Sequence, residues 1–309
     1  MSFDQWLVDH EPQIRITFFF GIFVVMAIWE IKYPRRQLIV SKVTRWINNI
    51  SLVVLNSVLL RFIFPTLAVG VSVFATEQQW GILNHYSLPF VLSVFISFVF
   101  LDLIIYLQHV LVHAVPALWR LHRVHHSDKD YDLTTGARFH PIEIIISMLI
   151  KFSAIIVIGA PVVAVIIFEV VLNTMAMFNH ANVKLPTSID GKIRKLLVTP
   201  DMHRVHHSIE DDETNSNFGF NLSIWDRLFG TYRNQPRAGH EDMIIGIRTF
   251  TDNKDVVSLP GLLMLPFKGK ISDYAINRRT WSEKDIATHK KNAMHNEDSS
   301  KDDQTDHRR

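Results

Sequence analysis

Residues 144–178 form a long apolar run that reads IIISMLIKFSAIIVIGAPVVAVIIFEVVLNTMAMF. The tripeptide GAP at 159–161 lies at its middle and predicts a turn, because proline ends the preceding helix and glycine permits unusual backbone angles. Each half then holds about 18 residues, and at 1.5 Å per residue a helix of roughly 27 Å nearly matches a bilayer core. The run therefore predicts two helices that cross a membrane as a hairpin.

The only charges in this run lie at matching positions. Lys151 and Glu169 are equally far from Ala160, so an antiparallel hairpin places them at the same depth. An unpaired charge in hydrocarbon is costly, which favours an ion pair between the two side chains. The alternative is that each side chain faces a polar partner of its own.

Three more apolar runs precede the hairpin, at residues 16–29, 46–76 and 78–107. The first is shorter than the ~20 residues that a spanning helix prefers, although Glu30 and Lys32 can reach out to the headgroups. The acidic residues before it do not resemble the basic start of a signal peptide, so we expect this run to remain as an anchor. The sequence predicts an all-α integral membrane protein with four to five transmembrane helices.

The loops predict the orientation and the division of the chain. Basic residues crowd positions 35–45, whereas positions 76–87 hold neither lysine nor arginine, so the first loop should face the cytoplasm. Paired crossings then return everything after residue 178 to that side. We expect residues 1–184 to hold the transmembrane helices and the first histidine clusters, 185–280 to form a cytosolic helical cap that completes a metal site, and the charged segment 281–309 to be a disordered tail.

Composition excludes several classes of site. The chain has 48% hydrophobic residues, a formal net charge of +2 and no cysteine. Disulfides, cysteine-ligated zinc and iron–sulfur clusters are therefore excluded, and any metal must be held by nitrogen or oxygen. The basic residues flank apolar runs instead of forming a basic face with stacking aromatics, so nucleic acid is not an expected partner.

Histidines are concentrated in a repeated hexapeptide, HRVHHS, at residues 122–127 and again at 203–208. Offsets of three and four residues place the imidazoles of each cluster on one helical face. Buried together, such rings would repel one another if protonated and would lack partners if neutral, whereas a divalent metal binds the neutral form. The eight clustered histidines are His109, His113, His122, His125, His126, His203, His206 and His207.

The number of histidines exceeds what one ion can use, since a structural zinc takes four ligands and a catalytic zinc three. Two ions with four or five ligands each fit the count. Neutral imidazole suits zinc, iron, copper and nickel alike, so the ligand type does not select the element.

The order and spacing of these motifs resemble the fatty acid hydroxylase / sterol desaturase superfamily of membrane di-iron oxygenases. The resemblance runs from about residue 101 to 232 and rests on HVLVH (109–113), HRVHH (122–126), RFHPIE (138–143), NHANV (179–183), HRVHH (203–207) and TNSNFGFNLSIWDRLFGTY (214–232). It implies a cap that holds two Fe²⁺ ions over the helices and uses O₂ and two electrons to oxidise a lipid C–H bond. By motif position, the eight histidines would be ligands, together with His180 and His140.

The chain departs from the family pattern at one position. Some lipid hydroxylases of the superfamily carry a further histidine four residues before the one in the NHAN-like element, and this chain has Ala176 there. Either His140 supplies the missing imidazole or one metal has a ligand fewer.

The expected function is O₂-dependent hydroxylation or desaturation of a membrane lipid, such as a sterol, fatty acyl or ether lipid, with hydroxylation favoured. The chain has no Gly-rich dinucleotide motif, so electrons would come from a separate cytochrome, ferredoxin or reductase. The alternative is a histidine-rich membrane metal transporter or metal-binding protein. Transporters place polar ligands near the middle of the membrane, whereas these clusters lie just outside the apolar runs.

Asp102 is a polar residue inside an apolar run, and two roles fit it. It lies two helical turns before His109, so it could orient that ring. It could equally pair with Arg61 inside the membrane. Trp225, in the WDRLFGTY segment, is expected to be a core residue.

Overall fold

The computed structural model describes residues 3–64 and 66–269. Within these ranges every regular element is a helix, and β-structure is limited to isolated bridges. Five segments are long and apolar enough to cross a membrane, which confirms the predicted all-α membrane class. They are Gln5–Lys32, Lys42–His85, Phe90–Ala114, Pro141–Ile158 and Val162–Asn179. The predicted disordered tail, 281–309, lies outside the described residues.

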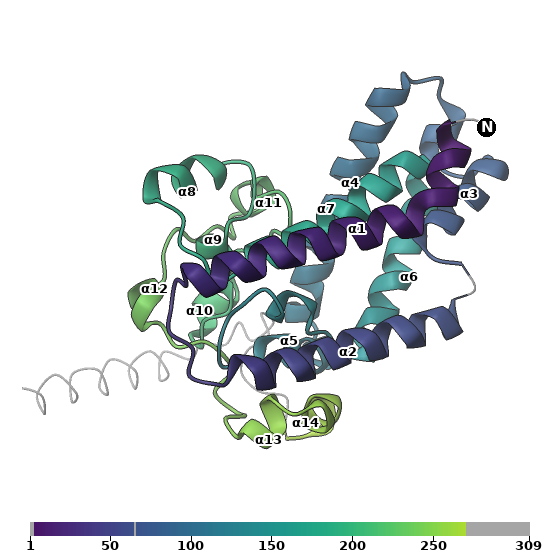
Figure 1. Cartoon of the computed structure of the whole chain (residues 1–309). Coiled ribbons are helices and arrows are strands. Elements are labelled where there is room, and N and C mark those ends of the chain that lie inside the picture. The colour runs from purple at the N-terminus through teal and green to yellow at the C-terminus, as the bar shows by residue number, and fades with distance from the viewer. Residues whose placement is uncertain (1–2, 65, 270–309) are drawn as a thin grey trace, which may run out of the picture.

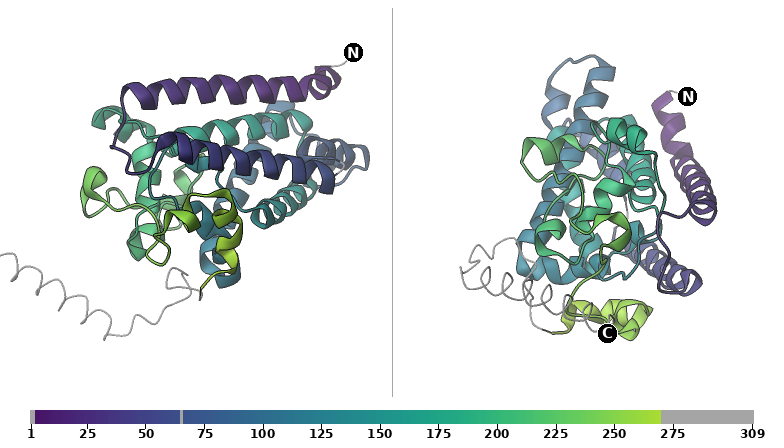
Figure 2. Two further views of the ribbon diagram at one scale, coloured as in Figure 1. Left: turned by 60° about the horizontal axis from the view of Figure 1, so that its bottom comes forward. Right: turned by 90° about the vertical axis from the view of Figure 1, so that its left-hand side faces the viewer.

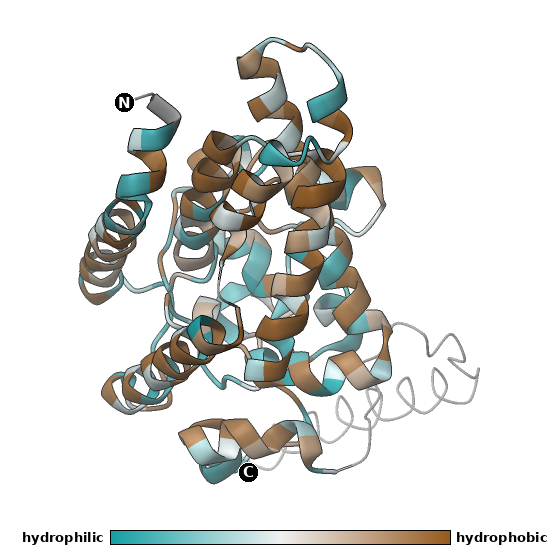
Figure 3. Ribbon diagram, turned by 90° about the vertical axis from the view of Figure 1, so that its right-hand side faces the viewer, coloured by the Kyte–Doolittle hydropathy of each residue, from teal (hydrophilic) through white to brown (hydrophobic). Residues whose placement is uncertain are grey.

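The long helices pack side by side, as Figures 1 and 2 show. Helix α1 runs along α7, and α4 packs against α6 and α7. Apolar residues make up most of these helices, as Figure 3 shows by colour, and many of them are exposed, which suits contact with lipid. The bounds are α1 Phe3–Lys32, α2 Lys42–Ile63, α3 Ala68–Glu77, α4 Phe90–Ala114, α6 Pro141–Ile158 and α7 Val162–Asn179.

Short helices gather at one end of the long ones and form a cap (Figure 1). The cap begins with α5, which follows α4 almost directly, and otherwise comes from the chain after α7. Its helices are α5 Pro116–His126, α8 Thr187–Ile193, α9 Pro200–His206, α10 Asp211–Thr214, α11 Ile224–Leu228, α12 Gly239–Asp242, α13 Asn253–Val256 and α14 Leu259–Met264. Three 3₁₀ turns complete the described elements: η1 Ile82–His85, η2 Thr135–Ala137 and η3 Leu265–Phe267.

The apolar run at 46–76 is divided between two helices. Helix α2 ends at Ile63, and Phe64 has extended backbone angles. Residue 65 is proline in the sequence, and a proline disfavours the helical conformation of the residue before it. Helix α3 continues the run from Ala68.

The predicted hairpin is confirmed. Gly159 ends α6 in the left-handed conformation, with φ of 71°, and α7 begins at Val162. The turn is packed closely against the segment after α3, because a Cβ on Gly81 would lie 2.2 Å from the Gly159 nitrogen. The hydroxyl of Ser72 also donates to the carbonyl of Ala160 at 2.6 Å.

The predicted ion pair in the hairpin is also confirmed. Lys151 Nζ donates to Glu169 Oε1 at 2.5 Å, and all but a few per cent of both side chains is buried. Arg15 of α1 reaches the other oxygen of Glu169 at 3.3 Å, a contact that the sequence did not suggest. Glu169 therefore pairs with two cations, Lys151 of α6 and Arg15 of α1.

This arrangement predicts an unequal response to removing each charge. Glu169→Gln leaves Lys151 without its counter-ion and leaves Arg15 with Glu11 alone, at 2.7 Å, so it should cost about 3–5 kcal/mol of unfolding free energy, as for other broken buried pairs. Lys151→Met should cost less, because Arg15 still faces Glu169. Unfolding of the purified variants in mixed micelles measures both values. Equal losses in the two variants would contradict the shared role of Glu169, and the double variant Lys151→Met/Glu169→Gln is the control for lost packing.

Candidate metal centre

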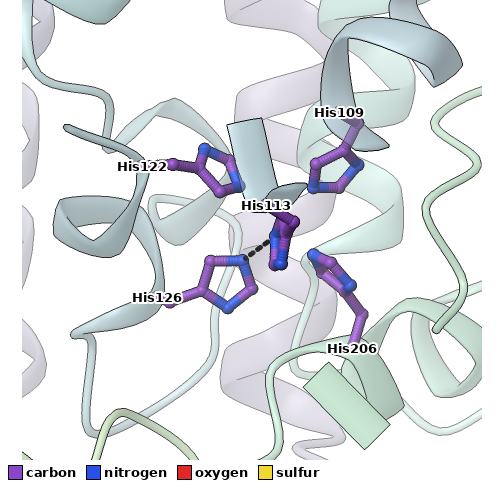
Figure 4. A group of neighbouring side chains, drawn as sticks. All are labelled: His109, His113, His122, His126 and His206. Carbon is purple, nitrogen blue, oxygen red and sulfur yellow. Dashed lines mark hydrogen bonds between the residues drawn. The ribbon is translucent and has the colours of Figure 1, made fainter. Parts of the chain in front are cut away.

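Nine of the ten predicted ligands come together in two buried groups, each with ligand atoms within 4.8 Å of one another. The first group, shown in Figure 4, contains five rings: His109, His113, His122, His126 and His206. The second contains four: His125, His180, His203 and His207. Helices α4, α5 and α9 and the end of α7 meet at this point, so segments far apart in sequence build each group.

The repeated hexapeptide serves both groups at once. In α5, His122 and His126 face the first group while His125 faces the second. The α9 copy does the reverse: His203 and His207 join the second group and His206 joins the first. An HxxHH pattern puts rings on adjoining faces of one helical turn, so each copy bridges two neighbouring sites. The two groups abut, since the rings of His126 and His207 stack with centroids 4.6 Å apart.

The other residues of the hexapeptide hold its helix in place. Val124 and Val205 are completely buried, and so are the guanidinium groups of Arg123 and Arg204. Arg123 donates to the carbonyl of Leu265 at 2.6 Å, whereas Arg204 donates to the carbonyl of Ala181 at 3.2 Å. Each arginine thus ties a histidine-bearing helix to a different backbone segment.

Acceptors outside the groups fix the orientation of several rings. Phe218 and Ser216 present their carbonyls to Nδ1 of His109 and His206 at 2.8 Å, and Ala176 presents its carbonyl to Nδ1 of His180 at 2.9 Å. A carbonyl oxygen only accepts, so Nδ1 must carry the proton. The other ring nitrogen, Nε2, then has a free lone pair directed into the group.

Two side chains act on further rings of the first group. Glu143 Oε1 lies 2.6 Å from Nδ1 of His122, and Asn215 Oδ1 lies 3.3 Å from Nδ1 of His113. A carboxylate behind a ligating histidine fixes its tautomer and makes the inner nitrogen a stronger donor. Inside the group, Nε2 of His113 and Nε2 of His126 lie only 3.1 Å apart (Figure 4).

The ring nitrogens that face into the two histidine groups suit a metal ion. Among the described residues, Nε2 of His109, His122 and His206 is buried with no hydrogen-bond partner, and both nitrogens of His207 are likewise unpartnered. A buried polar atom without a partner is costly, and a metal ion would satisfy several of these atoms at once. The donor set is therefore suited to two ions, five imidazoles facing one and four facing the other.

Burial keeps the rings outside the spanning helices neutral. Burial, with the neighbouring imidazoles as a second cause, holds the pKa of His126, His203 and His207 well below the usual value. Burial also lowers the pKa of His180 to about 3. Neutral imidazole is the form that binds metal.

His140 lies apart from both groups. Its Nδ1 accepts from the backbone nitrogen of Ile142 at 3.2 Å and so caps the start of α6, and its Nε2 lies 3.2 Å from the carbonyl of Leu263. The second group thus has one ring fewer than the first. Ala176, which stands where the sequence analysis noted a departure from the family pattern, lines a cavity.

Asp102 has neither of the two roles considered for it. Its Oδ2 accepts from Trp225 Nε1 at 2.8 Å and from the backbone nitrogen of Leu222 at 3.2 Å. The carbonyl of Phe218 orients His109, and Arg61 is exposed on the surface of α2. Asp102 therefore fastens the segment before α11 to α4. Trp225 is buried beside Tyr106 and Phe218, as expected for a core residue.

The sequence reasoning missed Glu143, Asn215 and the carbonyls of Ser216 and Phe218. Glu143 had a usable signal, because it lies in the RFHPIE motif and directly precedes the apolar run at 144–178. The backbone carbonyls had none, since any residue type supplies the same acceptor. Their positions follow from the path of the chain after α10.

A cavity of about 300 Å³ borders both groups through His109, His122 and His125. Helices α2, α4, α6 and α7 line it, mostly with apolar side chains such as Leu60 and Leu172. Its polar lining includes Gln108 and Ser147, which bond to each other at 3.0 Å. A narrow apolar space thus leads from within the spanning helices to the histidines.

The part of the chain that carries the histidine groups is similar to known proteins. Residues 94–231 match the family model described as "Fatty acid hydroxylase". The ornithine lipid hydroxylase OlsE of Rhizobium tropici is 32% identical over 155 residues, which is 50% of this chain and 46% of that protein. Alkylglycerol monooxygenase of Xenopus tropicalis is 33% identical over 137 residues, 44% of this chain and 30% of that protein.

The human alkylglycerol monooxygenase is 28% identical over 156 residues, covering 49% of this chain and 32% of that protein. The chain thus spans less than half the length of these curated relatives. No solved structure matches it significantly. The matched residues include all nine grouped histidines and the helices that carry them. Residues 94–231 of this chain therefore match the fatty acid hydroxylase family, and the relatives that share this region are described as a lipid hydroxylase and as monooxygenases.

Proposed function

We propose that this chain is a membrane-bound lipid hydroxylase that inserts one oxygen atom from O₂ into a C–H bond of a lipid. The observation that carries the proposal is the apolar cavity that ends at both histidine groups. An apolar cavity between membrane-spanning helices suits a hydrocarbon chain, and a centre of unpartnered imidazoles suits two redox-active ions. Relatives described as an ornithine lipid hydroxylase and as alkylglycerol monooxygenases support hydroxylation over desaturation.

Two Fe²⁺ ions, when bound, would supply the O₂ activation that protein side chains cannot provide. His109, His113, His122, His126 and His206 would hold one ion, and His125, His180, His203 and His207 the other. We leave His140 out of the ligand set, because it belongs to neither group and its Nε2 lies 3.2 Å from the carbonyl of Leu263. The balanced reaction, RH + O₂ + 2e⁻ + 2H⁺ → ROH + H₂O, needs two electrons, and we assign their delivery to a separate cytochrome, ferredoxin or reductase.

The protein's own residues exclude water and orient the substrate. Val112 and Phe139 line the cavity that the histidines border, and Phe139 stacks on the ring of His125 with centroids 4.6 Å apart. A dry apolar wall keeps a hydrocarbon chain near the centre and protects reactive species from quenching. We place the centre on the cytoplasmic side, because the basic loop at 35–45 lies at the same end of the helices.

Lipid analysis of expressing and null cells tests the function. We expect expressing membranes to contain lipid species heavier by one oxygen, and their amount should fall when the cells are depleted of iron. A product lighter by two hydrogens would instead establish a desaturase. Metal uptake by reconstituted vesicles, with no change in lipid, would overturn the proposal in favour of a transporter.

Filling the cavity should lower activity without removing metal. Met148 lines the cavity, whereas its neighbour Leu149 is half exposed on the outer face of α6. Met148→Trp should lower kcat/KM at least about tenfold, roughly 1.4 kcal/mol, by occupying the space for the lipid chain. Leu149→Trp is the matched control and should leave kcat/KM unchanged. Equal rates in the two variants, at equal metal content, would show that the substrate does not use this cavity.

A further inference from the structure

The cap exposes apolar side chains in a patch near α11. Leu196, Leu228 and Phe229 form this patch, and Leu228 and Phe229 are 69% and 52% exposed. The backbone nitrogen of Ser223, just before α11, donates to the carbonyl of Leu196 at 2.9 Å, so the two segments are joined. We call these three residues the α11 patch.

A second exposed apolar patch lies on α14 and η3. Met264 and Phe267 are 52% and 61% exposed and form what we call the α14 patch. The other side of this segment is buried, since Leu262 and Leu265 pack against Leu52 of α2. Figure 1 shows α11 and α14 on opposite sides of the histidine-bearing helices α5 and α9.

The two segments that carry the patches each contact a spanning helix well inside its cap end. The ring of Phe229 stacks on Tyr106 with centroids 5.4 Å apart, and Tyr106 lies about 12 Å before the end of α4 at Ala114. Leu262 packs on Leu52, about 15 Å after the start of α2 at Lys42. Each contact therefore lies more than two helical turns from the cap end of the helix concerned.

The length of α4 shows where the bilayer must reach. From Phe90, where α4 begins, to Tyr106 the helix covers only about 24 Å, and any tilt shortens that span. A hydrocarbon core is about 30 Å thick, or roughly 20 helical residues, so any such stretch within the candidate span Phe90–Ala114 includes Tyr106. The level of both patches then falls inside or at the edge of the core.

We infer that the cap is seated in the membrane, with the α11 patch and the α14 patch inserted among phospholipid acyl chains on opposite sides of the histidine groups. Apolar patches of this kind are costly in water but suit the boundary between headgroups and acyl chains. The exposed side chains of Lys192, Lys195 and Arg227 adjoin the first patch and complement the lipid phosphates. The centre thus lies at headgroup level, where lipid can enter the cavity without crossing water. The inference holds whatever reaction the centre performs.

The absence of cysteine from the sequence makes a direct test possible. Leu228→Cys and Met264→Cys, each in the otherwise unchanged full chain, can be nitroxide-labelled and placed in nanodiscs of phosphatidylcholine and phosphatidylglycerol. Collision rates with O₂, which concentrates in lipid, and with a water-soluble nickel chelate then report depth. Leu107→Cys, on the exposed face of α4, is the lipid control, and Gln235→Cys, exposed in the cap, is the aqueous control.

We expect the O₂-to-nickel accessibility ratio at both test positions to lie within about twofold of the Leu107 value. A ratio equal to that of Gln235 at either position would overturn the inference. All four positions are exposed, so the substitutions leave the core intact, and metal content of each labelled variant confirms folding.

Discussion

Replacing His206 with alanine is expected to remove one metal ion per chain and to lower lipid hydroxylation on the order of 10²- to 10³-fold. His206 belongs to the five-ring group, and its ring is held by the carbonyl of Ser216. Losing one of five donors weakens one site, and the several kcal/mol that a bound metal supplies to the reaction correspond to that loss in rate. Elemental analysis and product formation from the same preparation measure the two effects together.

His203→Ala is the companion variant in the other group. It removes one of only four rings, so we expect it to lose its ion at least as completely as His206→Ala does. His85→Ala is the control, because His85 is exposed in η1 at the far end of the helices. If both histidine variants kept two ions per chain, the assignment of ligands would be wrong. If each lost both ions, the two groups would be one cooperative unit.

The sequence predicts the features that arise from local spacing. The GAP turn, the hairpin and the matched depths of Lys151 and Glu169 all follow from helix periodicity and length, and the structure confirms them. The histidine clusters were equally visible, because offsets of three and four residues are a property of one helix. The sequence could not show which ring joins which group, since that depends on how α4, α5 and α9 cross.

The features that were missed depend on contacts between distant segments. Asp102 bonds to Trp225 across more than a hundred residues, and Arg15 reaches Glu169 from the first helix to the seventh. Neither pairing has a spacing that a single sequence could reveal. The same holds for Arg123, which donates to the carbonyl of Leu265 in η3.

His140 illustrates a limit of reasoning from motif position. It lies in RFHPIE with Glu143, and both were read as one element of the family pattern. In the structure, Glu143 faces the first group through His122, whereas His140 turns away and caps α6. A helix start at Pro141 explains the difference, because the residue before the first turn of a helix points its side chain back to the backbone nitrogens.

Glu143→Gln should weaken metal binding to the five-ring group by about 10- to 100-fold, although Glu143 is not itself among the grouped ligands. Its Oε1 lies 2.6 Å from Nδ1 of His122, which fixes the proton on that nitrogen and directs Nε2 inward. Glutamine keeps the shape but loses the charge that strengthens His122 as a donor. Competition with a chelator of known affinity measures the change, and we expect only one of the two ions to be affected.

Ser147→Ala is the matched control for this variant. Ser147 lies one turn further along the same face of α6 and lines the same cavity, but it bonds to Gln108 instead of a histidine. It should alter lipid binding without changing the affinity for metal. Equal metal affinity in Glu143→Gln and the unaltered protein would mean that the carboxylate only packs against His122. Loss of both ions in Glu143→Gln would mean that it supports the whole centre, because His122 of the first group and His125 of the second are carried on the same turn of α5.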